Sequence, residues 1–123
     1  MELLQIVKGP SPRSLVLVGD LDASTAHRLA DALAAQHEEP GDVRLDLSGL
    51  EFLDSVGLSA LIATARRLGE GDHLVLISPQ DTVRRTLQIS GVAGALPSLI
   101  VEDDGAGPKD GSGEPQETEV SPR

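Results

Sequence analysis

One serine occupies a place where a phosphate or a nucleophile is expected, in the stretch Asp46-Leu47-Ser48-Gly49-Leu50-Glu51-Phe52-Leu53-Asp54-Ser55-Val56-Gly57-Leu58. Alternating apolar residues over 43–47 predict a half-buried strand, and an apolar stripe over 58–68 predicts a helix that begins at Asp54-Ser55. Ser55 would then lie at a helix N-terminus, where unpaired backbone N–H groups and the helix dipole stabilise an anion. A phosphate on Ser55 would therefore not disrupt its own helix.

Two other interpretations of this stretch are open. Asp54 and Ser55 are residue types that commonly cap a helix without any further role. Alternatively, Ser55-x-Gly57 is similar to the end of the G-x-S-x-G nucleophile elbow of hydrolases, with His73 as a possible base. The hydrolase is the weaker hypothesis, because position 53 is Leu and the first glycine of that motif is missing. Gly57 lowers helix propensity, which favours a place where another surface approaches the helix backbone closely.

A second polar cluster, Gly19-Asp20-Leu21-Asp22-Ala23-Ser24, lies between a predicted strand and a predicted helix. Acids at a helix start are normally caps that stabilise its dipole, and we favour this interpretation for Asp20 and Asp22. The alternative is a cation held by Asp20, Asp22 and Asp54, but no metal-binding motif has this spacing. Because the histidines show no metal-ligand spacing either, neither a metal nor another cofactor is expected.

Hydrophobic periodicity predicts the elements that position both clusters. Strands are expected over 3–7 and 14–18, and the short turn-rich link between them favours an antiparallel pair. The apolar stripe over 26–33 predicts a helix, for which Ser24 or Thr25 is the expected N-cap. Pro40-Gly41 is expected to close the exit from this helix.

The second half of the chain continues this alternation. A fully apolar strand is expected over 74–77, and a short strand over 99–101. Between them a third helix is predicted, with Ser78 as N-cap, Pro79 as its first residue and Gly91 as its C-terminal cap. The resulting order, ββαβαβαβ, predicts an α/β domain with a mixed sheet and packed helices.

Length and composition limit the possible functions. The chain has 123 residues, a formal net charge of −10 and no Cys. The length predicts one domain, and the lack of Cys excludes a thiolate nucleophile or a disulfide framework. The acidic charge argues against nucleic acid as a partner, and a single aromatic residue, Phe52, cannot form a base-stacking platform. Neither a secretory signal nor a membrane span is expected, so we expect no membrane partner and a cytoplasmic location.

The composition changes near residue 103. Residues 105–123 contain four Gly, three Pro and four acids, with Ala106 and Val120 as the only apolar side chains. Such a segment cannot bury enough apolar surface to offset the entropy of ordering. The expected organisation is therefore one domain over 1–102, followed by a disordered acidic tail over 103–123.

The motifs resemble the STAS domain of bacterial anti-sigma factor antagonists. The resemblance rests on Gly19-Asp20-Leu21-Asp22, on Asp46-Leu47-Ser48 through Phe52, and on Asp54-Ser55-Val56-Gly57-Leu58 in its strand–helix context. The third-helix region fits the same family through Ser78-Pro79, Val83-Arg84, Leu87 and Ser90-Gly91-Val92. It implies that Ser55 is the phosphoacceptor of a cognate anti-sigma factor, a histidine-kinase-like ATPase that acts as a serine kinase. The unphosphorylated protein would bind this kinase and free a sigma factor. Phosphorylation would block that binding, and a PPM-type serine phosphatase would restore it.

The resemblance also implies a partner-binding surface on this protein and assigns catalysis to its partners. The expected surface comprises Asp20, Asp22, Ser24, Asp54, Ser55, Val56, Gly57 and Leu58. All catalysis would belong to the partners, so we expect no catalytic residue and no enzyme here. An alternative is a constitutive STAS interaction subunit of a stress-signalling scaffold or of a phospholipid-transport ABC system. Val56 motivates this alternative, since many members have Ser or Thr at that position.

Overall fold

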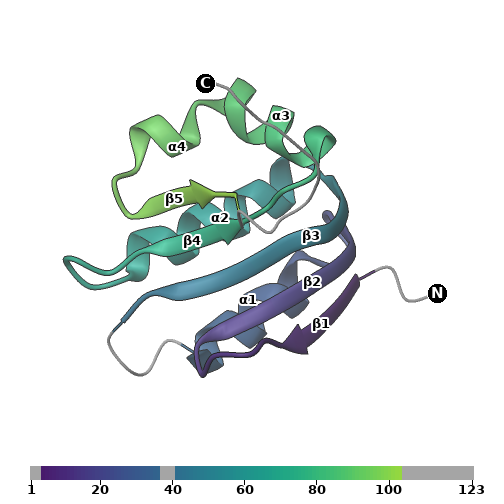
Figure 1. Ribbon diagram of the computed structural model, residues 1–123. Helices are drawn as coiled ribbons and strands as arrows, with labels where there is room; N and C mark the ends of the chain where they lie inside the picture. The colour runs from purple at the N-terminus through teal and green to yellow at the C-terminus, as the bar shows by residue number, and fades with distance from the viewer. Residues whose placement is uncertain (1–3, 37–40, 104–123) are drawn as a thin grey trace, which may run out of the picture.

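The computed structural model describes residues 4–36 and 41–103, which form a single α/β domain around a five-stranded mixed sheet (Figure 1). The sheet order is β1 (Leu4–Lys8), β2 (Ser14–Leu21), β3 (Val43–Leu53), β4 (Leu74–Ile77) and β5 (Leu99–Glu102). β1 and β2 are antiparallel, whereas β2 to β5 are parallel to one another. The predicted α/β class with a mixed sheet is confirmed.

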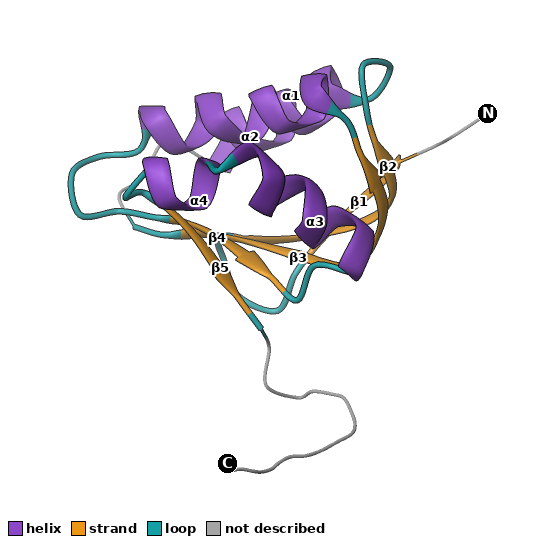
Figure 2. Ribbon diagram, turned by 90° about the horizontal axis from the view of Figure 1, so that it is seen from above, coloured by secondary structure: helices purple, strands orange, loops and turns teal. Residues whose placement is uncertain are grey.

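The helices in the described residues are α1 (Ala26–Gln36), α2 (Ser55–Arg67), α3 (Asp81–Ser90) and the short α4 (Val92–Ala95). Each crossover advances by one strand in the same direction, and right-handed crossovers then place the helices on one face of the sheet. Figure 2 shows this arrangement from above. Leucines from the sheet and from α1, α2 and α3 fill the space between the layers. α4 is an addition to the predicted order of elements.

β3 is much longer than the sequence predicts. The expected strand ends at Leu47 and is followed by a loop, but β3 continues to Leu53. Its pairing with β2 shifts register twice, between Val16 and Val18 and between Gly19 and Asp20. Each shift leaves an extra residue on β3, which is the geometry of a β-bulge. The bulges break the alternation of buried and exposed residues, and this explains why the sequence pattern resembles a loop.

The start of α3 also corrects a prediction. Ser78 and Pro79 precede the helix, which begins at Asp81 with Gln80 as its N-cap residue. Ser78 instead adopts a φ of 54°, the left-handed conformation that turns the chain out of β4. The Gln80 side chain donates to the Ser48 carbonyl oxygen at 2.8 Å and so ties the helix start to β3. Gly91, with a φ of 71°, ends the helix as predicted.

Several predictions concern residues outside the described ranges. The Pro40 exit signal, Leu3 and the tail from residue 104 onwards lie there. Among the residues that the structure describes, no helix has the length and apolar character needed to cross a membrane.

Candidate functional site

The two polar clusters predicted from sequence meet at the carboxyl edge of the sheet, where β2 and β3 both end (Figure 1). Leu21 and Leu53, the last residues of these strands, are register partners, and both are buried in the core. Directly after them, the Asp54 amide donates to the Leu21 carbonyl oxygen at 3.2 Å. The β2–α1 turn and the first turn of α2 therefore form one continuous surface.

The Asp54 carboxylate holds this surface together. Its Oδ1 accepts from the Gly57 amide at 2.8 Å, which caps α2 as the sequence predicts. Its Oδ2 accepts from the Ala23 amide at 3.2 Å, across 31 positions of the chain. One side chain therefore both begins the helix and fixes the neighbouring turn.

Gly57 is required by the contact between these two segments. A Cβ atom at this position would lie 2.6 Å from the Leu21 carbonyl oxygen and 2.8 Å from Leu21 Cγ. The predicted close approach is therefore real, but the approaching surface is the end of β2 rather than a partner. Any larger residue would push α2 away from the sheet.

Asp22 organises the turn before α1. Its Oδ1 accepts from the Ser24 hydroxyl at 2.8 Å and from the Ser24 amide at 2.9 Å. The hydroxyl contact is the main reason that the pKa of the Asp22 carboxyl lies below its ordinary value, and the amide contact and Thr25 lower this pKa further. The buried Thr25 accepts from the Asp22 amide and donates to the Asp20 carbonyl oxygen. Thr25 directly precedes α1, as predicted for the N-cap, and its hydroxyl bonds to the turn before the helix.

Ser55 is presented outwards by this framework. It is the first residue of α2 and is exposed, and its hydroxyl forms no hydrogen bond with other described residues. Its carbonyl oxygen accepts from the Ser59 hydroxyl at 2.9 Å. The Ser55 hydroxyl is therefore open to an enzyme that approaches from solvent.

Comparison with known proteins identifies the family. The family model described as "Mlab, STAS domain" matches residues 5–102. The chain belongs to the STAS domain family. A crystal structure of an anti-sigma factor antagonist from Mycobacterium paratuberculosis superimposes on this STAS domain with a TM-score of 0.68 and 29% identity, over 79% of this chain and 85% of the other. The anti-sigma factor antagonist SpoIIAA in its unphosphorylated form shares the fold, with a TM-score of 0.61 and 21% identity, over 80% and 86% of the two chains.

Curated relatives of this STAS domain carry similar names. The anti-sigma-F factor antagonist RsfB of Mycobacterium tuberculosis is 32% identical over 63% of this chain. The match spans 65% of the length of RsfB, just under two thirds. The anti-sigma-B factor antagonist of Listeria monocytogenes is 28% identical over 73% of this chain and 81% of its own length.

The predicted partner residues of the STAS domain differ in exposure. Ser24, Ser55 and Val56 are exposed, and Asp20, Asp22 and Asp54 are half-buried. Gly57 and Leu58 are buried, and their contacts are internal to the domain. Gly57 and Leu58 therefore pack inside the domain and position the backbone from which Ser55 and Val56 project.

Two neighbours of Ser55 are missing from the prediction. Glu51 and Phe52 occupy the second bulge of β3 and are exposed, between the buried Leu50 and Leu53. The sequence offered one signal for these neighbours. Phe52, an aromatic residue, lies next to Glu51 between two leucines, Leu50 and Leu53, which the structure shows to be buried. The sequence predicts a loop for both residues, and Phe52 ends a motif that carries the family resemblance, but neither is among the predicted site residues.

The structure argues against the hydrolase and cation alternatives. Val43 at the start of β3 donates to the His73 carbonyl oxygen, whereas Ser55 follows the other end of β3. Eleven strand residues at about 3.3 Å each separate these ends by roughly 30 Å, so His73 cannot act as base for Ser55. Both Asp54 oxygens and Asp22 Oδ1 accept hydrogen bonds from the chain itself, which supports their interpretation as capping groups.

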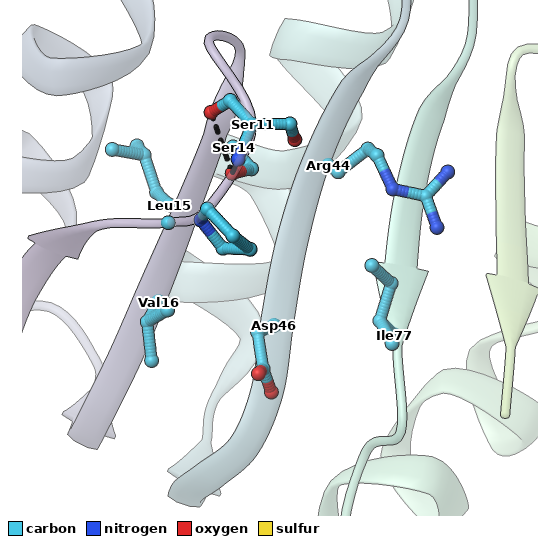
Figure 3. A pocket seen from close by; sticks show the side chains of 9 residues that line it. Ser11, Ser14, Leu15, Val16, Arg44, Asp46 and Ile77 are labelled. Carbon is cyan, nitrogen blue, oxygen red and sulfur yellow. Dashed lines mark hydrogen bonds between the residues drawn. The ribbon is translucent and has the colours of Figure 1, made fainter. Parts of the chain in front are cut away.

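A pocket of about 200 Å³ lies elsewhere, on the face of the sheet that the helices leave open (Figure 3). Ser11, Ser14, Arg44, Asp46 and Ile77 contribute to its lining. Ser14 Oγ accepts from the Ser11 amide at 3.1 Å and donates to the Ser11 carbonyl oxygen at 2.9 Å. Arg44 forms an ion pair with Glu102. With these groups paired internally, the carboxyl edge is the better candidate site.

Proposed function

We propose that this STAS domain is an anti-sigma factor antagonist that works by partner switching under the control of Ser55 phosphorylation. The unphosphorylated form binds an anti-sigma factor that is also an ATP-dependent serine kinase, and a sigma factor is released. Phosphorylated Ser55 blocks the complex, and a PPM-type phosphatase restores it. The exposed Ser55, whose hydroxyl is unbonded among the described residues, carries the proposal, and the names of the relatives support it.

The charge around Ser55 makes a phosphate an effective switch. Asp20, Asp22 and Asp54 lie on the same surface, and the sequence contains no Lys or Arg over 14–27 or 45–65. Phosphorylation adds a charge of about −1.5 to −2 at pH 7. Because this charge meets no basic side chain from these two segments, a partner that covers Ser55 has to pair it or desolvate it.

The energy needed for switching is small. A hundredfold loss of affinity requires only about 2.7 kcal/mol. Leaving a charge unpaired in a packed interface costs about 3–5 kcal/mol. The fold itself is expected to tolerate the phosphate, because anions at the start of a helix are stabilised by its amides and dipole. Switching then needs no rearrangement of the domain.

In-vitro phosphorylation tests the acceptor. The full chain is incubated with its cognate anti-sigma factor and ATP, and the modified residue is located by peptide mass spectrometry. We expect one phosphate, on Ser55, and none in Ser55→Ala. Ser59 is a matched control, since it is exposed one turn later in α2, and Ser59→Ala should be phosphorylated normally. Phosphate on another residue, or none on the wild type, would overturn the proposal.

Binding measurements test the switch itself. Ser55→Ala should bind the anti-sigma factor like the wild type, whereas Ser55→Asp should bind at least about a hundredfold more weakly. Ser59→Asp carries the same charge one turn away and should bind more tightly than Ser55→Asp. Urea unfolding should show that Ser55→Asp is as stable as the wild type. Equal affinities of Ser55→Ala and Ser55→Asp would contradict phosphorylation control and favour a constitutive interaction subunit.

A further inference from the structure

Two large apolar side chains, Phe52 and Val56, flank Ser55 in the sequence and are exposed. Their exposed fractions are 50% and 46%, whereas the nearby Leu50, Leu53 and Leu58 are buried. Apolar side chains within a polar rim are typical of surfaces that another protein covers. Phe52 is also the single aromatic residue of the chain, and aromatic side chains are enriched at the centre of protein interfaces.

The backbone at Phe52 is held from both sides. Phe52 is the register partner of Asp20 on β2, and the bulge at this point lets both Leu50 and Leu53 face the core while Phe52 faces solvent. The adjacent Glu51 carbonyl oxygen accepts from Thr82 of α3 at 3.3 Å, which fixes the bulge from the other side. A side chain on a fixed strand loses less conformational entropy on binding than one on a mobile loop.

The rim around these apolar side chains is acidic. Glu51 precedes Phe52, Asp20 lies beside it on the neighbouring strand, and Asp54 separates it from Ser55. The segments 14–27 and 45–65 supply no basic residue to neutralise these carboxylates. An apolar centre whose acidic rim meets no basic residue from these two segments fits a protein surface that has an apolar pocket surrounded by Lys and Arg.

We propose that Phe52 is the anchor by which the STAS domain holds its anti-sigma factor. The ring enters an apolar pocket rimmed by basic residues on that partner, and Val56 packs beside it on the other side of Ser55. This inference rests on the proposed function and deepens it. Contacts on both sides of Ser55 exclude water from its hydroxyl, so a phosphate there meets a desolvated interface.

Affinity measurements on purified full chain and purified anti-sigma factor test the anchor. We expect Phe52→Ala to bind at least about tenfold more weakly, and Phe52→Leu to show an intermediate affinity. Ile89→Ala is the matched control, because Ile89 is 78% exposed on α3, seven residues beyond the Thr82 contact with Glu51. It should bind within about twofold of the wild type. Urea unfolding of each variant verifies that the domain is folded at the concentrations used.

A label at the ring gives an independent measurement without substitution. Since Phe52 is the sole Phe, incorporation of 4-fluorophenylalanine places one fluorine in the whole chain, at this ring. On binding, its ¹⁹F resonance should shift and lose most of the difference between H₂O and D₂O that marks contact with solvent. The unlabelled partner contributes no signal.

The outcomes separate the two proposals. If the wild type binds but Phe52→Ala binds equally well, or the bound fluorine keeps its solvent response, the anchor is overturned and the proposed function stands. If the wild type does not bind the anti-sigma factor at all, both proposals fail. Weaker binding of Phe52→Ala together with a solvent-shielded fluorine supports the anchor.

Discussion

The two ends of β2 and β3, at opposite edges of the sheet, differ in the groups that their charged side chains meet. At the carboxyl edge, Asp22 and Asp54 accept hydrogen bonds from backbone amides, and no basic side chain from 14–27 or 45–65 balances them. At the amino edge, charged side chains form hydrogen bonds with neighbouring segments of the fold. Arg13 donates to the carbonyl oxygens of Gly41 and Asp42, and the Asp42 carboxylate accepts from the His73 amide at 2.8 Å and contacts its ring at 3.3 Å.

The two sets of groups differ in what they do. Those at the amino edge hold segments of the fold together, whereas those at the carboxyl edge also expose a surface to solvent. Amino-edge groups satisfy one another and join three segments of the fold. Carboxyl-edge groups shape the backbone equally well but leave net negative charge and two apolar side chains facing outwards. A partner with complementary positive charge can recognise a surface whose backbone is held in place and whose negative charge is not balanced by basic residues of the same segments. The following four experiments test this contrast, from the largest expected effect to the smallest.

Gly57→Ala tests the tightest contact of the carboxyl edge. The added Cβ would overlap the Leu21 carbonyl oxygen and side chain, so the free energy of unfolding should fall by about 3 kcal/mol in urea titrations. Gly94→Ala is the control, because that position is exposed in α4 and open around its Cβ. It should change stability by less than about 1 kcal/mol, in the stabilising direction. Similar losses in both variants would refute the packing argument.

Asp54→Ala tests whether one carboxylate joins the two segments. Loss of the α2 cap and of the Ala23 contact should cost about 1–2 kcal/mol of unfolding free energy. Asp54→Ser keeps a capping oxygen and should recover part of this loss. Asp42→Ala removes the corresponding contact at the amino edge and should cost about 1 kcal/mol without weakening partner binding. Normal partner binding by Asp54→Ala would contradict its place in the presented surface.

Arg44→Met tests how much a matched surface charge contributes. Arg44 and Glu102 form an ion pair at 3.4 Å across β4, and both side chains are nearly half exposed. Exposed pairs contribute less than about 1 kcal/mol, so the urea midpoint should change little. Glu102→Gln removes the other charge and should behave alike. A loss well above 1 kcal/mol in either variant would show that this exposed ion pair matters more than we infer.

Asp22 gives the smallest effect, which depends on pH. The Ser24 hydroxyl lowers the pKa of the Asp22 carboxyl in the folded state. As the pH falls towards the ordinary pKa of about 3.9, this carboxyl is therefore protonated in the unfolded chain before it is protonated in the folded one. Its contribution to stability is therefore present above about pH 4 and is lost as the pH falls through the folded-state pKa. An NMR titration of the carboxyl carbon should give a pKa that rises in Ser24→Ala. Titration of wild-type Asp22 at or above the ordinary value would contradict this.

The sequence predicts local features of this molecule better than contacts between distant segments. The Asp54 cap and the position of Ser55 follow from a periodic stripe and a residue type that suits a helix start. The contact of Asp54 with Ala23 joins residues 31 positions apart, and the hydrophobic periodicity of the sequence carries no information about it. The end of β3 is missed because two bulges disturb its alternation, and the exposure of Phe52 is missed for the same reason. Ser78 and Pro79 match a capping pattern that the left-handed Ser78 overrides.

The fixed backbone of the carboxyl edge has a consequence for how such domains diverge. Asp54, Gly57 and Leu21 constrain one another, so none of them changes freely without a cost in folding. Val56 projects from the same backbone into solvent and carries no such constraint, whereas Ser24 is held by its hydrogen bonds to Asp22. After gene duplication, substitutions at Val56 can alter the choice of partner while the domain keeps its stability. A cell with several copies can in this way keep parallel signalling pathways separate.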